Sequence, residues 1–151
     1  MHNQLESFLG LSGVLTGCGR IQLLGTAMTK QYFATLEAAL PPGVLDQLLG
    51  AYQQSAQAGD RESAVESAIL NDPKLGPVAR ALILLWYCGN WGGLPDAWHS
   101  AYGTAATEKV GVVSAEAFRA GLQWLIIGAH APGTAQQGFA SWSVLPGEIR
   151  I

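Results

Sequence analysis

The chain has 151 residues and a net charge of −3. Charged residues make up 13% of the sequence and hydrophobic residues 49%, whereas charged residues account for about 25% of a usual soluble domain. The chain is slightly acidic and has no Lys/Arg cluster, so its charges do not support nucleic-acid binding. The low charge predicts an exposed apolar patch and therefore a protein partner.

The length of the chain is close to the usual size of one domain, and the sequence has no internal repeat or change of composition. We therefore expect residues 1–151 to form a single, compact, all-α domain of about five to seven helices. A loop-rich C-terminal tail is expected from residue 129 onwards. The 19 glycines follow no period, which excludes a collagen-like chain.

Apolar residues at spacings of three and four predict helices in the first half of the chain. One helix is expected over residues 5–15, and one of about five turns over residues 21–40. The second should end at Pro41, and Pro42 should occupy the first turn of a helix over residues 44–52.

The middle of the chain contains the most apolar segment. Asp60 is expected to cap a short helix over residues 61–70, because its side chain can accept a hydrogen bond from a free backbone N–H. A core helix should then run from Pro77 to Gly89. After Arg80 it is apolar nearly all round, which predicts burial on most sides.

In the second half of the chain the predicted helices and strands are shorter. Pro95 is expected to start one or two helical turns over residues 96–102. A weak strand signal covers residues 110–113, and Ser114 should cap a last helix over residues 115–127.

Five tryptophans are many for a chain of this length. Trp86 and Trp124 lie in predicted helices, so we assign them mainly to the core. Trp91, Trp98 and Trp142 fall in or near predicted loops, and we assign them to an interface, where tryptophan buries a large area and keeps a polar handle.

Asp96 and His99 are the first candidates for chemistry, because they would share one face of a helix. A metal site needs a third ligand, and His130, the only other internal histidine, does not lie at a fixed spacing from them. We interpret the pair as a surface aspartate beside a loop histidine. No catalytic, cofactor-binding or metal residue is predicted.

The two cysteines are the second candidates. Cys18 lies between two glycines but has no identifiable base to activate it, and the segment lacks the Lys-Ser/Thr end of a phosphate loop. The spacing of Cys18 and Cys88 fits no zinc pattern. A disulfide and two buried free thiols both stay open, and we favour free thiols.

The apolar runs of the sequence are short. The longest run covers residues 81–88, whereas a membrane-spanning helix needs about 20 apolar residues. The N-terminus lacks the basic and apolar regions of a signal peptide. We expect no direct membrane insertion, with a cytoplasmic location if Met1 is native. If an export signal was removed, a periplasmic or inner-membrane-associated complex is expected.

Four short motifs follow one another along the chain. They are residues 11–17 (LSGVLTG), residues 84–89 (LLWYCG), the helix over residues 116–124, and residues 138–142 together with Pro146. This ordered set resembles the small (gamma) accessory subunit of membrane-bound FAD-dependent sorbitol and glucose dehydrogenase complexes. The resemblance covers nearly the whole chain.

The resemblance implies a role in assembly. In such complexes a large subunit carries FAD and the catalytic residues, a cytochrome c subunit takes the electrons, and the small subunit resembles a chaperone and export escort. We therefore expect this chain to bind no cofactor and to contact the FAD-containing catalytic subunit. The expected contact residues are Trp86, Tyr87, Trp91, Trp98, Tyr102, Phe139, Trp142 and Pro146.

Three features depart from that family. The twin-arginine segment is missing, residues 130–132 lack a cysteine that several members carry, and Ala140 and Ser141 are additional residues before Trp142. An alternative hypothesis is a stand-alone helical module that binds a small apolar ligand or associates with itself. The aromatic content and low charge suit this alternative equally well.

Overall fold

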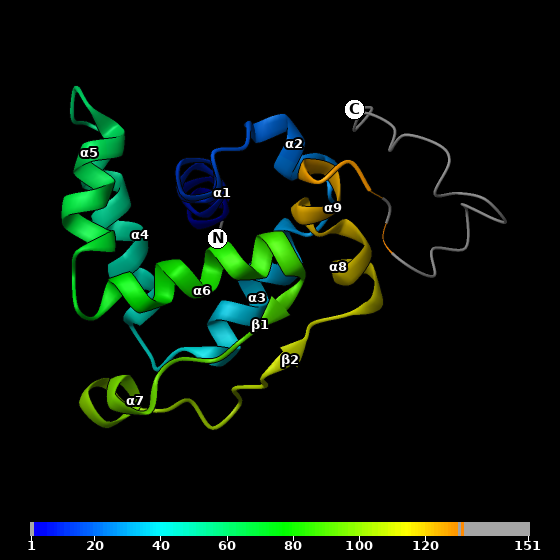
Figure 1. The fold of residues 1–151 in the computed structure, drawn as a ribbon. Coiled ribbons are helices and arrows are strands. Elements are labelled where there is room, and N and C mark those ends of the chain that lie inside the picture. The colour runs from blue at the N-terminus through cyan, green and yellow to red at the C-terminus, as the bar shows by residue number, and fades with distance from the viewer. Residues whose placement is uncertain (1, 130, 132–151) are drawn as a thin grey trace, which may run out of the picture.

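The computed structural model describes residues 2–129 and 131, and over this range the protein is all-α, as predicted (Figure 1). Helix α6 runs across the middle of the molecule and contacts α1, η1, β1 and α9. The elements in chain order are α1 (His2–Thr16), α2 (Arg20–Gly25), α3 (Thr29–Ala39), α4 (Val44–Ser55), α5 (Arg61–Val65), the π-helix η1 (Glu66–Leu70), α6 (Leu75–Cys88), β1 (Asn90–Trp91), α7 (Asp96–Tyr102), β2 (Gly111–Val112), α8 (Ala115–Ala120) and α9 (Leu122–Ile126).

Helix α6 confirms the predicted core helix and begins two residues earlier, at Leu75. The Asp72 carboxylate accepts hydrogen bonds from the backbone N–H groups of Lys74 (2.8 Å) and Leu75 (2.7 Å), which satisfies donors that have no partner inside the helix. Gly89 ends the helix in the left-handed conformation, with φ 66°. Burial is less complete than predicted, because Leu84 is 54% exposed.

Aromatic side chains join three helices in the core. Trp86 of α6 is fully buried and meets the ring of Tyr32 from α3 edge-on, with centroids 4.8 Å apart. Phe8 of α1 stacks on Trp86 at 6.3 Å and meets Phe33 of α3 edge-on at 5.6 Å. The core thus links α1, α3 and α6, which are far apart in sequence.

The long helix predicted over residues 21–40 is wrong, because the chain breaks it into α2 and α3. Ala27 has a positive φ of 60°, and the hydroxyl of Thr26 accepts a hydrogen bond from the N–H of Met28 at 3.2 Å. Because of the break, the apolar residues of α2 do not continue the buried face of α3. Ile21 and Leu24 are therefore 52% and 47% exposed, although their spacing had placed them on the buried face.

Two further helix boundaries differ from the prediction. Pro42 does not lie in the first turn of α4, because Gly43 precedes Val44 as the N-cap with φ 86°. The helix predicted over residues 115–127 is divided at Gly121, where a β-carbon would come within 2.7 Å of the Tyr87 carbonyl oxygen. The breaks produce more and shorter helices than the five to seven expected.

The predicted caps are confirmed. Asp60 accepts a hydrogen bond from the N–H of Ser63 at 3.1 Å, and Ser114 accepts one from the N–H of Ala117 at 3.0 Å. The weak strand signal corresponds to β2, which pairs antiparallel with β1 through Trp91 and Gly111. Among the described residues, no helix combines the length and apolar character needed to cross a membrane.

Gly89 is predicted to be more sensitive to substitution than Gly17, although both have a positive φ (66° and 73°). In Gly17→Ala the new methyl group meets nothing within 4 Å, so only the left-handed backbone conformation is strained, by about 1–2 kcal/mol. In Gly89→Ala it also overlaps the backbone carbonyl of Ala117, which should cost roughly a further 1–3 kcal/mol. Urea unfolding of both variants measures the difference, and equal losses would contradict the close approach of α6 and α8.

Tyr32→Phe is predicted to stabilise the protein by about 1 kcal/mol, because the buried hydroxyl of Tyr32 has no hydrogen-bond partner among the described residues. Burial, with a smaller contribution from Cys88, raises the pKa of Tyr32 from 10 to about 12. The unfolded chain therefore loses this proton first, and the free energy of unfolding of the wild type should fall between about pH 10 and pH 12. Unfolding measured across this range should show a smaller fall in the variant; an identical fall would place the loss at another group.

Candidate functional site

Three of the tryptophans expected at a partner interface form part of the core. Trp86 and Trp91 are 0% exposed and Trp98 is 4% exposed. The indole N–H of Trp91 donates to the Glu108 carboxylate at 2.9 Å, and that of Trp98 donates to the Lys74 carbonyl at 2.7 Å. The three rings have almost no free surface to offer a partner. The polar ends of Trp91 and Trp98 are satisfied within the chain, whereas the indole N–H of Trp86 has no hydrogen-bond partner among the described residues. Burial of Trp86 agrees with its assignment to the core.

The remaining predicted contact residues are placed differently. Tyr87 and Tyr102 are partly exposed; Tyr87 donates to the Thr16 carbonyl at 2.8 Å, and Tyr102 packs on Trp98 with ring centroids 5.3 Å apart. Phe139, Trp142 and Pro146 lie outside the described residues. The structure therefore brings Trp98 and Tyr102 together on α7 but leaves Tyr87 at the end of α6.

His99 belongs to a polar cluster that sequence reasoning missed. Its Nε2 lies 3.4 Å from Oε2 of Glu108, whose other oxygen accepts from Trp91. Its Nδ1 lies 3.2 Å from the Gly103 carbonyl oxygen, to which it can only donate. His99 is thus a helical residue that pairs with Glu108, and the description of a loop histidine beside Asp96 is wrong. No spacing pattern in the sequence links Glu108 to His99, because Glu108 follows in a separate loop.

Both cysteines are free thiols in the structure. Cys88 lies 3.7 Å from Oε1 of Gln123, and Cys18 lies in the turn between α1 and α2. Among the described residues, no group of three or more His, Cys, Asp or Glu side chains is placed to share a metal ion.

Large aliphatic side chains are exposed at one end of the molecule. Ile21 and Leu24 on α2 are about half exposed, and Ile126 and Ile127 at the end of α9 are 63% and 66% exposed. Helices α2 and α9 lie at the same end of the molecule (Figure 1). We call these four residues the α2–α9 surface. Leu84, Val110 and Val112 are also exposed, on α6 and along β2.

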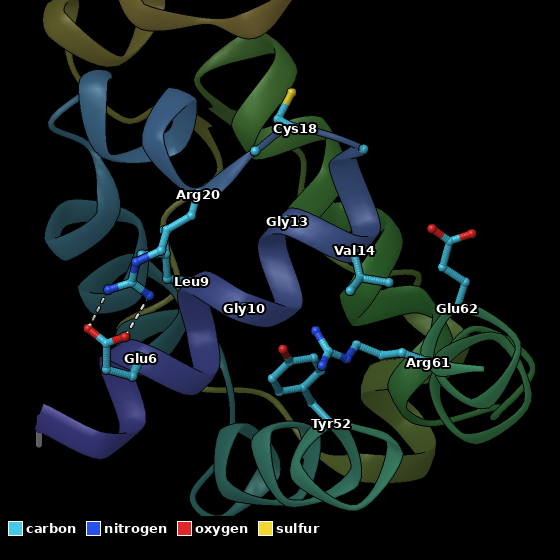
Figure 2. A pocket seen from close by; sticks show the side chains of 12 residues that line it. Glu6, Leu9, Gly10, Gly13, Val14, Cys18, Arg20, Tyr52, Arg61 and Glu62 are labelled. Atoms are coloured by element: carbon cyan, nitrogen blue, oxygen red, sulfur yellow. Dashed lines mark hydrogen bonds and ion pairs between the residues drawn. The ribbon is translucent and has the colours of Figure 1, made fainter. Parts of the chain in front are cut away.

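A pocket of about 570 Å³ opens beside α1, and we call it the α1 pocket (Figure 2). Its residues come from α1, the turn after it, α2, α4 and α5. They are Glu6, Leu9, Gly10, Gly13, Val14, Gly17, Cys18, Gly19, Arg20, Tyr52, Arg61 and Glu62. Sequence reasoning missed this site, although the glycines of α1 recur at helical spacing and could have indicated a face that another element approaches closely.

A second pocket, of about 620 Å³, lies between α3 and the segment around β2. Ala34 and Ala38 of α3 face Val110, Val112 and Val113 across it, so its walls are largely apolar. The hydroxyl of Thr107 donates to the Ala38 carbonyl at 2.6 Å and holds the two walls together.

The chain matches no protein-family model, no curated protein and no solved structure. Inference about function therefore rests on the four sequence motifs and on the geometry of the described residues.

Glu108→Ala is predicted to destabilise the protein by about 1–3 kcal/mol, because it leaves the fully buried indole N–H of Trp91 without an acceptor. Glu108→Gln should lose less, since its amide oxygen can still accept from Trp91. Glu116→Ala is the matched control, because Glu116 is an exposed carboxylate paired with Arg119 and should change stability by less than about 0.5 kcal/mol. Chemical denaturation measures all three. Equal effects of Glu108→Ala and Glu116→Ala would contradict a structural role for the Trp91 bond.

Proposed function

We propose that this chain is a non-catalytic accessory subunit that binds the FAD-containing catalytic subunit of a sugar or polyol dehydrogenase complex. A cytochrome c subunit is the expected third member of such a complex. The motifs over residues 11–17, 84–89, 116–124 and 138–146 supply the family resemblance. The observation that carries the proposal is the α2–α9 surface, because it supplies an apolar area that a partner would cover.

The energetics of the α2–α9 surface favour a protein partner. Transferring an aliphatic side chain from water into an apolar environment contributes about 1.5–3 kcal/mol when burial is complete. Ile126 and Ile127 retain about two thirds of their exposure, and Ile21 and Leu24 about half. Covering the four together would therefore contribute several kcal/mol to binding, which is typical of the apolar centre of a stable interface.

The proposed contact differs from the one that the sequence predicted. Burial of Trp86, Trp91 and Trp98 leaves the aliphatic α2–α9 surface as the better docking area among the described residues. Helix α9 also leads along the chain towards residues 138–146, which carry the closing motif of the family resemblance.

The double variant Ile126→Glu/Ile127→Glu is predicted to weaken binding of the flavoprotein subunit by at least about 2 kcal/mol, because it places two charges at a desolvated contact. Val110→Glu/Val112→Glu is the matched control, since these two side chains are 68% and 60% exposed and lie outside the α2–α9 surface, Val112 in β2 and Val110 directly before it. The measurement is co-expression with the large subunit of an FAD-dependent sugar or polyol dehydrogenase, followed by size-exclusion chromatography with FAD absorbance read across the peak.

The wild-type protein should co-elute with a yellow large subunit that is insoluble or poor in FAD when it is expressed alone. The Ile126/Ile127 variant should lose this peak and the Val110/Val112 variant should keep it. Separate wild-type peaks with a fully active large subunit would reject the accessory role. Co-elution of both double variants would instead reject the α2–α9 surface as the contact.

The alternative function, a stand-alone module for a small apolar ligand, is supported by the pocket between α3 and β2. Its walls of alanine and valine side chains suit an apolar molecule. The same chromatography separates the two functions, because a stand-alone module elutes without the flavoprotein.

A further inference from the structure

The α1 pocket contains a cation and a hydroxyl group that have no partner within the described part of the chain. We propose that this pocket binds a small organic monocarboxylate, held by the guanidinium group of Arg61 and the hydroxyl group of Tyr52. This inference does not depend on the proposed function, because the pocket is formed by α1, α2, α4 and α5 and includes no residue of the α2–α9 surface.

The position of Tyr52 is fixed by Gly10. The hydroxyl end of the Tyr52 ring comes so close to α1 that a β-carbon on Gly10 would lie 2.9 Å from the ring carbon Cζ and overlap the hydroxyl oxygen. Only a glycine lets the ring fit beneath the helix (Figure 2). Tyr52 is consequently 8% exposed and its hydroxyl group is directed at the wall of the pocket.

The hydroxyl group of Tyr52 makes no hydrogen bond to any described residue. Tyr52 is buried as a residue, but its hydroxyl group lines the pocket, where it can bond to water or to a ligand. An oxygen atom of a ligand in the α1 pocket could accept this proton. The group therefore supplies a hydrogen-bond donor for a polar occupant of the pocket.

The two arginines that line the pocket differ in how they are used. Arg20 is engaged by the Glu6 carboxylate through two bonds, of 2.6 Å and 2.9 Å. The guanidinium group of Arg61, at the start of α5, makes no ion pair or hydrogen bond among the described residues. Figure 2 shows its guanidinium group extending into the space between α1 and Tyr52. The planar fork of a free guanidinium group matches the two oxygens of a carboxylate.

The charge balance of the pocket favours one negative charge on the ligand. Glu6 neutralises Arg20, and Glu62 stands at the rim beside Arg61 (Figure 2). A phosphate dianion would bring a second negative charge near these carboxylates, where no further unpaired cation lines the pocket. A monocarboxylate carries a single negative charge, which the guanidinium group of Arg61 can neutralise by itself.

The remaining wall and the size of the pocket indicate an apolar body on the ligand. Leu9 and Val14 add apolar side chains to the lining of the pocket. A volume of about 570 Å³ falls within the range of roughly 300–1,000 Å³ that small-molecule pockets occupy. The chemical class is therefore a small organic acid with one carboxylate and a compact apolar part.

The test is a titration of the 15N-labelled full chain with sodium benzoate, followed by the amide signals of Gly10 and Gly13. Saturable shifts are expected in the wild type. Arg61→Gln should raise the dissociation constant about tenfold or more, because a charge-assisted pair is lost, and Tyr52→Phe should raise it roughly threefold. Arg119→Gln is the matched control, since Arg119 is an exposed arginine on α8 outside the pocket, and should leave the constant unchanged.

Two further probes test the chemistry. Benzamide has the shape of benzoate without its charge and should bind at least about tenfold more weakly, and inorganic phosphate should also bind more weakly. The proposal is overturned if benzoate gives no saturable shift, if Arg61→Gln and Arg119→Gln behave alike, or if either probe binds as well as benzoate. The ligand-free spectra of the variants show whether each keeps the fold, and Arg61 is exposed at the start of α5, so its substitution should leave the core intact.

Discussion

Burial of the Trp86 ring is the interaction on which the rest of the fold depends. The ring lies between Phe8 of α1 and Tyr32 of α3, so one side chain of α6 holds three helices that the sequence separates widely. An aromatic ring of this size buries a large area, and edge-on and stacked contacts add to that contribution. The arrangement positions α1 and thereby the α1 pocket.

Close backbone approach is the second device that the structure uses repeatedly. Gly10 admits the ring of Tyr52 beneath α1, and Gly89 and Gly121 allow the ends of α6 and α8 to meet with backbone against backbone. Because none of these contacts leaves room for a β-carbon, each depends on the glycine at its position. At Gly10 the same approach also turns a polar group towards a pocket.

The low charge of the chain is reflected in aliphatic side chains at the surface. Trp91 and Trp98 reach hydrogen-bond acceptors inside the chain, so both can be almost completely buried. Ile126 and Ile127 do not pack into the core and remain exposed at the end of α9. An accessory subunit could use this distribution well, because its rigid aromatic core would present an aliphatic surface to a partner.

The sequence by itself determined the helical class, the core helix α6 and the caps at Asp60 and Ser114, because these follow from local periodicity and from side chains that bond their own backbone. Only the tertiary structure decided the burial of Trp91 and Trp98. Their acceptors, Glu108 and the Lys74 carbonyl, lie 17 and 24 residues away along the chain, beyond any local pattern. The break near Ala27 and the pocket between Tyr52 and Arg61 likewise arise from packing between elements, which spacing along one helix does not specify.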